Sequence, residues 1–365
     1  MNKNIRISVR QFTVLILLYT IGTTILVIPS SLAVDAKQNA WIAAAAGCLI
    51  STAIVGLYIW LGGKLGDRTL IEYVEYVFGK WMSVPLTLLF LFFSFIGSAT
   101  VLFYIGNFMT TQVMPETPIE SIVILFTCII VMGLLAGLEV LARAAEILMP
   151  WFLLLFIVST FFLIPEIEIE KIQPVTEIGL KPIFKASLSY LGTASLPLFV
   201  FLMVFPAFIH DRAKAKKGFL IGNLLGGLFI IVITFLSISI LGADFTERNL
   251  YPSYALAKKI NVGDFIQRVE ILMAGMWFIT IFFKISFYSY SFVTGLAQLC
   301  GIKEYRPLVV PYGILLIVYS LTVYPDVVYM MDFDSTVYIP YILSIALLLP
   351  AFILAAGAIK ENMSK

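Results

Sequence analysis

The sequence predicts an all-α, polytopic membrane protein with about ten transmembrane helices, built as a five-plus-five inverted repeat in which helices 1 and 6 are broken. The membrane class follows from composition: 61% of the residues are hydrophobic and only 13% are charged, whereas soluble domains carry about 25% charged residues. The repeat follows from two polar interruptions of hydrophobic segments that lie half a chain apart, a pattern typical of inverted-repeat transporters.

Ten hydrophobic segments are long enough to span a bilayer, since a transmembrane helix needs about 20 largely apolar residues. We place them at 10–34, 40–62, 82–109, 118–138, 143–164, 183–209, 217–242, 264–299, 307–324 and 335–359. The stretches between them are short. Residues 1–365 are therefore expected to form a single transmembrane domain, with repeat one at about 10–164 and repeat two at about 183–359.

The distribution of basic residues predicts the orientation of the chain. Lysine and arginine accumulate in cytoplasmic loops, and here they precede the first span and form the run HDRAKAKK at 210–217 after the sixth. The loop after the fifth span, at 165–182, is rich in glutamate instead. With an even number of spans, we expect both termini in the cytoplasm.

The first span contains the unusual stretch TIGTTILVIPSSL at residues 20–32. Gly22, Thr23, Thr24 and Pro29 weaken or interrupt helical hydrogen bonding, and an unpaired backbone group exposed to lipid costs several kcal/mol. The interruption must therefore be covered by protein or line a cavity.

The sixth span repeats this feature in YLGTASLPLF at residues 190–199. Paired interruptions at matching positions of two halves indicate a ligand site near the middle of the membrane. The alternative is that each merely kinks or packs a helix, because Gly and Pro are common in membrane helices. The candidate ligand-binding residues are Gly22, Thr23, Thr24, Gly192, Thr193, Ala194 and Ser195.

Neither interruption carries a charged side chain. Backbone N–H and C=O dipoles at broken helix ends can bind an ammonium and a carboxylate at once. An amino acid is the simplest ligand with both groups.

Lys284 lies well inside the eighth span, in FITIFFKISFYSY. A charge within the membrane costs about 2.5–3.5 kcal/mol on insertion scales and is by default a functional candidate. Snorkelling is the alternative, but the inner end near Cys300 lies about 16 residues away, or roughly 24 Å of helix. We expect Lys284 either to supply a fixed positive charge where related transporters bind a cation or to carry a proton.

Three further charged residues are candidates for coupling or gating. Glu270, Trp277 and Lys284 recur every seven residues and share a helix face, so Glu270 could line an aqueous path or, with Arg268, anchor the helix at the interface. Arg143 and Glu146, with Glu139, can form a charged ladder on one helix. That ladder is either structural or an inner gate.

Tyr104 in the third span could reach the ligand cavity, with packing as the alternative. Catalytic, metal-binding and cofactor motifs are absent: there is no zinc motif, P-loop, Rossmann pattern or nucleophile elbow, and the three cysteines are scattered. No basic, aromatic-interleaved patch suggests nucleic acid. We therefore expect a binding or transport protein with no cofactor, not an enzyme.

Several segments together resemble the spore germination permease family, within the amino acid–polyamine–organocation transporter superfamily. They are IGTTILVIPSSL (21–32), EYVFGKW (75–81), GLEVLARAAEILMP (137–150), QRVEILMAGMWFITIFF (267–283) and VYPD (323–326). The resemblance spans essentially the whole chain, although each motif alone is loose.

The resemblance implies a LeuT-like fold and the role of a B subunit in a nutrient germinant receptor. Such a subunit would bind a small nutrient, often an L-amino acid, in the inner spore membrane and trigger germination together with a membrane A subunit and a lipoprotein C subunit. The alternative function is a proton- or cation-coupled amino acid permease, because one fold can serve both.

Overall fold

The computed structural model describes residues 6–175, 179–260 and 270–363. Within these ranges the chain is a bundle of helices, and a backbone bridge joins Ile7 to Ile209. Eight helical stretches are long and apolar enough to cross a membrane, and two shorter apolar helices accompany them. The protein is therefore a multi-pass membrane protein, while the number of ten spans stays a prediction.

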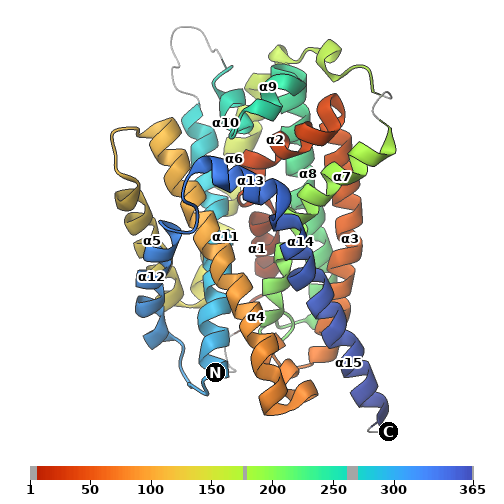
Figure 1. The fold of residues 1–365 in the computed structure, drawn as a ribbon, viewed down its shortest axis with the longest axis vertical. Helices are drawn as coiled ribbons and strands as arrows, with labels where there is room; N and C mark the ends of the chain where they lie inside the picture. The colour runs from red at the N-terminus through yellow and green to blue at the C-terminus, as the bar shows by residue number, and fades with distance from the viewer. Residues whose placement is uncertain (1–5, 176–178, 261–269, 364–365) are drawn as a thin grey trace.

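The helices follow the order of the predicted segments (Figure 1). In the first half they are α1 (Val9–Ile21), α2 (Thr24–Ala36), α3 (Ala40–Leu65), α4 (Leu70–Phe108), α5 (Ile119–Ala136) and α6 (Leu138–Leu163). In the second half they are α7 (Leu180–Tyr190), α8 (Arg212–Leu241), α9 (Ala243–Arg248), α10 (Pro252–Ala257), α11 (Glu270–Leu299), α12 (Arg306–Ser320), α13 (Val327–Thr336), α14 (Tyr338–Leu343) and α15 (Leu349–Met363).

Two helices begin before the predicted membrane spans for local reasons. The third segment begins at Leu70, because Thr69 and Glu72 form a capping box there. Gly79, at φ 78°, divides this helix, so its apolar part still begins close to residue 82. The fifth segment begins at Leu138 instead of 143, because Gly137 at φ 96° separates α5 from α6.

Both chain termini lie at one end of the bundle, and α2, α9, α10 and α13 lie at the opposite end (Figure 1). We call the latter the distal end. Helix α1 runs through the middle of the bundle and packs on α6, α8 and α11. Seven consecutive residues of α1, 15–21, are buried, so this helix is surrounded by protein and not by lipid.

A cluster of buried phenylalanines packs around the first turn of α1, near the terminal end. Phe12 stacks on Phe205 at 5.7 Å and meets Phe219 edge-on at 5.4 Å between ring centroids, while Phe201 stacks on Phe287 at 4.4 Å. All five side chains have no exposed surface. This aromatic cluster closes the middle of the bundle toward the termini.

Candidate functional site

The first interruption separates α1 from α2 at Gly22 and Thr23. Gly22 adopts φ +25°, a value that side chains disfavour. A Cβ at this position would lie 2.3 Å from Cδ of Lys284 and 2.8 Å from the Tyr19 carbonyl oxygen. Glycine is therefore required both by the backbone conformation and by the close approach of Lys284.

The second interruption follows α7, where Leu191–Ser195 forms a π-helical turn and Leu196–Met203 a 3₁₀ segment. These turns change the helical hydrogen-bonding pattern, and side chains bond to several of the carbonyls. The hydroxyl of Tyr338 donates to Gly192 O at 2.9 Å, that of Tyr58 to Leu196 O at 3.0 Å and that of Tyr19 to Pro197 O at 3.1 Å. The interruption is thus covered by protein, as the cost of bare backbone in a membrane requires.

Lys284 joins the two interruptions. Its Nζ donates to Thr23 Oγ1 at 3.1 Å and to the Thr193 carbonyl oxygen at 2.7 Å, and it lies 5.6 Å from the centre of the Tyr19 ring. The residue is 2% exposed, so its amine does not reach the end of the helix. Among the described residues no carboxylate pairs with it.

A cavity of about 660 Å³ opens beside this contact, within the 300–1,000 Å³ typical of small-molecule sites. Thr23, Thr193 and Lys284 line it at the interruptions. Its other walls come from α2, α4, α7, α11 and the α13–α14 region, and residues of α13 line it on the distal side.

The predicted ligand residues divide into two groups. Thr23, Tyr104 and Thr193 line the cavity together with Lys284. Gly22, Thr24, Gly192, Ala194 and Ser195 are outside its lining: Thr24 Oγ1 donates to Thr193 O at 3.3 Å, and Gly192 packs against Ile339. Residues of the second group therefore belong to the interruptions but do not face the cavity.

Sequence reasoning missed the acidic wall of the cavity. Asp334 on α13 lines the cavity and accepts hydrogen bonds from the hydroxyls of Tyr104 and Tyr324, the latter at 3.4 Å. Burial raises the pKa of this carboxyl group to about 6, although both phenol hydrogen bonds oppose the rise. The available signal was the pair of aspartates in MDFDS, which lie between the ninth and tenth predicted spans.

Glu270 lies away from the cavity, at the first described residue of α11. Trp277, on the shared helix face, is buried and meets Phe108 edge-on at 4.8 Å. This face is therefore packed at Trp277. The proposed partner Arg268 lies outside the described residues, so the interfacial anchor stays a prediction.

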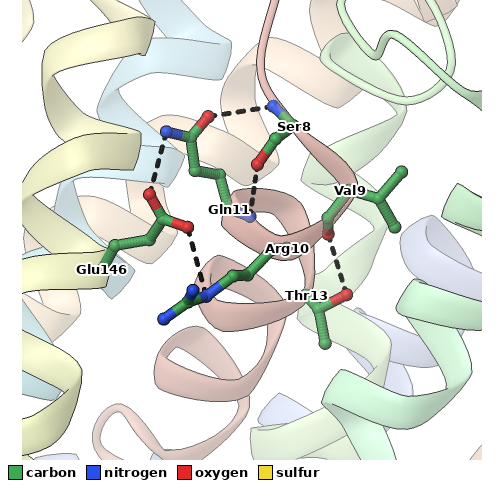
Figure 2. A network of polar contacts seen from close by, with 6 residues as sticks. All are labelled: Ser8, Val9, Arg10, Gln11, Thr13 and Glu146. Carbon is green, nitrogen blue, oxygen red and sulfur yellow. Dashed lines mark hydrogen bonds and ion pairs between the residues drawn. The ribbon is translucent and has the colours of Figure 1, made fainter.

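The predicted ladder of Glu139, Arg143 and Glu146 forms only in part. Arg143 pairs with Glu139 at 3.7 Å, on the continuous helix α6. Glu146 reaches across to α1 instead, where it pairs with Arg10 at 3.4 Å and accepts from Gln11 Nε2 at 3.1 Å (Figure 2). Arg143 and Glu146 thus act on different partners, and neither lines the cavity.

These contacts fasten the start of α1 at the terminal end. Ser8 caps α1 and exchanges hydrogen bonds with Gln11 (Figure 2), and Ile7 N donates to Phe208 O at 2.9 Å. We call the Arg10–Gln11–Glu146 contacts the inner latch. Together with the aromatic cluster, the latch separates the cavity from the terminal end.

We expect Glu146→Gln to loosen the inner latch without unfolding the protein. The Arg10 side chain of this pair is 82% exposed, so loss of the pair should change stability by less than about 1 kcal/mol. A cysteine placed at the buried Leu15 should then react faster with a thiol reagent added from the terminal side. Glu304→Gln, which removes an exposed ion pair with Arg306, is the control; equal rates in both variants would contradict the latch.

Comparison with known proteins agrees with this architecture. Residues 6–327 match the family described as spore germination protein. The chain is 30% identical over 324 residues to spore germination protein KB of Bacillus subtilis (strain 168), which covers 87% of this chain and 85% of that protein.

Two solved structures share the fold at 12% sequence identity. One is Mhp1, a nucleobase–cation symport-1 family transporter in a closed conformation with bromovinylhydantoin bound, with a TM-score of 0.72 over 96% of this chain and 78% of that one. The other is MhsT in complex with L-phenylalanine, with a TM-score of 0.65 over 95% and 97%. The predicted class of a LeuT-like transporter fold is therefore confirmed, and the sequence match shows that the chain belongs to the spore germination protein family.

Proposed function

We propose that this chain is the membrane B subunit of a nutrient germinant receptor, which binds a small nutrient, an L-amino acid, between its two helix interruptions. The observation that carries the proposal is the cavity at the contact of Lys284 with Thr23 and Thr193. Family membership supplies the link to spore germination. The relatives and structural neighbours are germination proteins and transporters, which favours binding over catalysis.

Lys284 is the proposed partner of the ligand carboxylate. A lysine ammonium has three donors, and two of them reach Thr23 and Thr193. The third is available to a ligand in the cavity that Lys284 lines. A ligand contact with Lys284 would act on both interruptions at once. Binding would in this way cause a conformational change in the rest of the bundle.

The assembly and orientation belong to the same proposal. The chain forms one domain of two repeats, at about 10–164 and 183–359, in the inner spore membrane with both termini in the cytoplasm. The positively charged 210–217 segment supports this orientation. The cavity then faces away from the cytoplasm, and partner A and C subunits receive the conformational change.

A proton- or cation-coupled amino acid permease is the second candidate. Two observations favour it: the solved neighbours are transporters, and Lys284 is a buried amine without a carboxylate partner among the described residues. Such an amine could exchange a proton during a transport cycle.

Uptake of labelled L-amino acids by the purified chain in proteoliposomes separates the two candidates. We expect saturable binding that reaches at most one ligand per protein, with no label inside the vesicles. Accumulation beyond one ligand per protein that collapses with the ion gradient would instead establish the permease. The control is the same vesicles with Lys284→Met protein, which should retain neither signal.

A further inference from the structure

Among the described residues that line the cavity, three charged side chains form an ion pair and three do not. Asp35 pairs with Lys185 at 2.8 Å, and Glu247 pairs with Lys37. Asp332 is exposed at the distal end. The remaining two are Lys284 and Asp334, which carry opposite charges and line the same cavity.

Hydrogen bonds hold Asp334 in place, but no ion pair with a cation is formed among the described residues. The hydroxyl of Tyr104 on α4 and that of Tyr324, before α13, donate to its two carboxylate oxygens. Within the described part of the chain no lysine or arginine pairs with it. A carboxylate has room for about four hydrogen bonds, so two phenol donors leave it with capacity to accept more.

The placement of Asp334 separates it from Lys284. Lys284 lies on α11 at the interruptions, and Asp334 lies on the short helix α13, which precedes the last span at the distal end (Figure 1). Lys284 is buried and Asp334 is partly buried, and charges removed from water without an opposite charge in contact carry uncompensated desolvation costs. A ligand with an anionic and a cationic group would compensate both.

We propose that Asp334, positioned by Tyr104 and Tyr324, is a subsite for the ammonium group of the ligand. This inference rests on the proposed function, in which Lys284 takes the ligand carboxylate. The ammonium can be the α-amine of an amino acid or an amine at the end of its side chain, and both have the same chemistry. Asp334 would thereby make the site selective for zwitterions over simple carboxylates.

The subsite should make binding depend on pH. A carboxylate binds an ammonium only when ionised, and the pKa of Asp334 is raised to about 6 by burial. The contribution of Asp334 to binding is therefore expected to be lost as pH falls through about 6. The titratable groups around Asp334 are Tyr104, Tyr324, Tyr338 and its neighbour Asp332; phenols, with an ordinary pKa near 10, stay neutral in this range.

The test measures binding of three probes to the purified full-length chain: L-norleucine, L-lysine and 6-aminohexanoate. Asp334→Asn keeps the shape of the side chain and removes its charge. It should weaken binding of at least one probe by about 10- to 100-fold, the effect expected for losing a charge-assisted hydrogen bond. Glu120→Gln removes an exposed charge from α5, outside the cavity lining, and is the control, with an expected change below about threefold.

The pattern across probes identifies the amine. If binding of norleucine weakens in Asp334→Asn, the subsite holds the α-amine. If only binding of lysine and 6-aminohexanoate weakens, the subsite holds the amine at the end of the side chain. Either result supports the proposal. So does a binding affinity that falls near pH 6 in the wild type but not in Asp334→Asn. Equal affinities of wild type and Asp334→Asn for every probe that binds would overturn the subsite alone. Failure of all three probes to bind wild-type protein would overturn it together with the proposed amino acid ligand.

Discussion

Gly22→Val is expected to abolish nutrient binding while the chain still inserts into the membrane. Valine at φ +25° is strained, and its Cβ would lie 2.3 Å from Cδ of Lys284 and 2.8 Å from the Tyr19 carbonyl oxygen. Backbone strain and overpacking each cost about 1–3 kcal/mol. The first interruption must shift, so we expect affinity to fall at least about thirtyfold, equivalent to ~2 kcal/mol.

Gly56→Val in α3 is the matched control for this change. A Cβ at Gly56 meets no atom within 4 Å, so the same substitution should leave binding and expression unchanged. Gly192→Val should have a smaller effect than Gly22→Val, because its Cβ would meet chiefly the tip of Ile339 at 2.7 Å, which can move. Gly22→Val protein that binds with wild-type affinity would contradict the role of the first interruption.

Lys284→Met is expected to remove ligand binding with little change in stability. The substitution relieves the cost of a buried charge, about 2.5–3.5 kcal/mol on insertion scales, and loses two hydrogen bonds from an ammonium, about 1.5–3 kcal/mol each. These effects offset each other to within a few kcal/mol. The ligand contact and the bridge between Thr23 and Thr193 are lost outright, so affinity should fall about 100-fold.

Lys185→Met provides the control for the loss of a positive charge at the cavity. Lys185 lines the cavity too, but its side chain is 72% exposed and pairs with Asp35, so the change should alter affinity by less than about fivefold. Binding is measured by equilibrium titration and stability by thermal unfolding in the same detergent. If Lys284→Met unfolded the protein or left binding intact, the bridging role of Lys284 would be wrong.

The sequence predicted the fold class and the centre of the site for physical reasons. Interruptions inside apolar segments are visible because lipid does not tolerate bare backbone, and this picked out Thr23 and Thr193, which line the cavity. Lys284 was visible because a charge in an apolar run is expensive. Both signals are local, so they need no knowledge of how helices pack.

The place of Asp334 in the cavity and the contacts of the inner latch could not be predicted in the same way. Asp334 lies in a short polar stretch between two spans, and only the fold of α13 over the cavity brings it to Tyr104. Glu146 was assigned to a ladder on its own helix, because helical spacing shows neighbours along a helix but not across the bundle. Its contact with Arg10 joins residues that are far apart in the sequence.

The most direct test of the central claim is whether a nutrient protects the cavity between the interruptions. Thr193→Cys, with Ser189→Cys as a second reporter on the same wall, would be made after replacing the exposed Cys128 and Cys300 with serine. We predict that a mixture of L-amino acids slows modification of both cysteines by a small thiol reagent at least about tenfold, but not of a cysteine at Leu180, which is 85% exposed and lies outside the cavity lining. Equal modification rates with and without amino acids at both reporters would contradict a nutrient site at the helix interruptions.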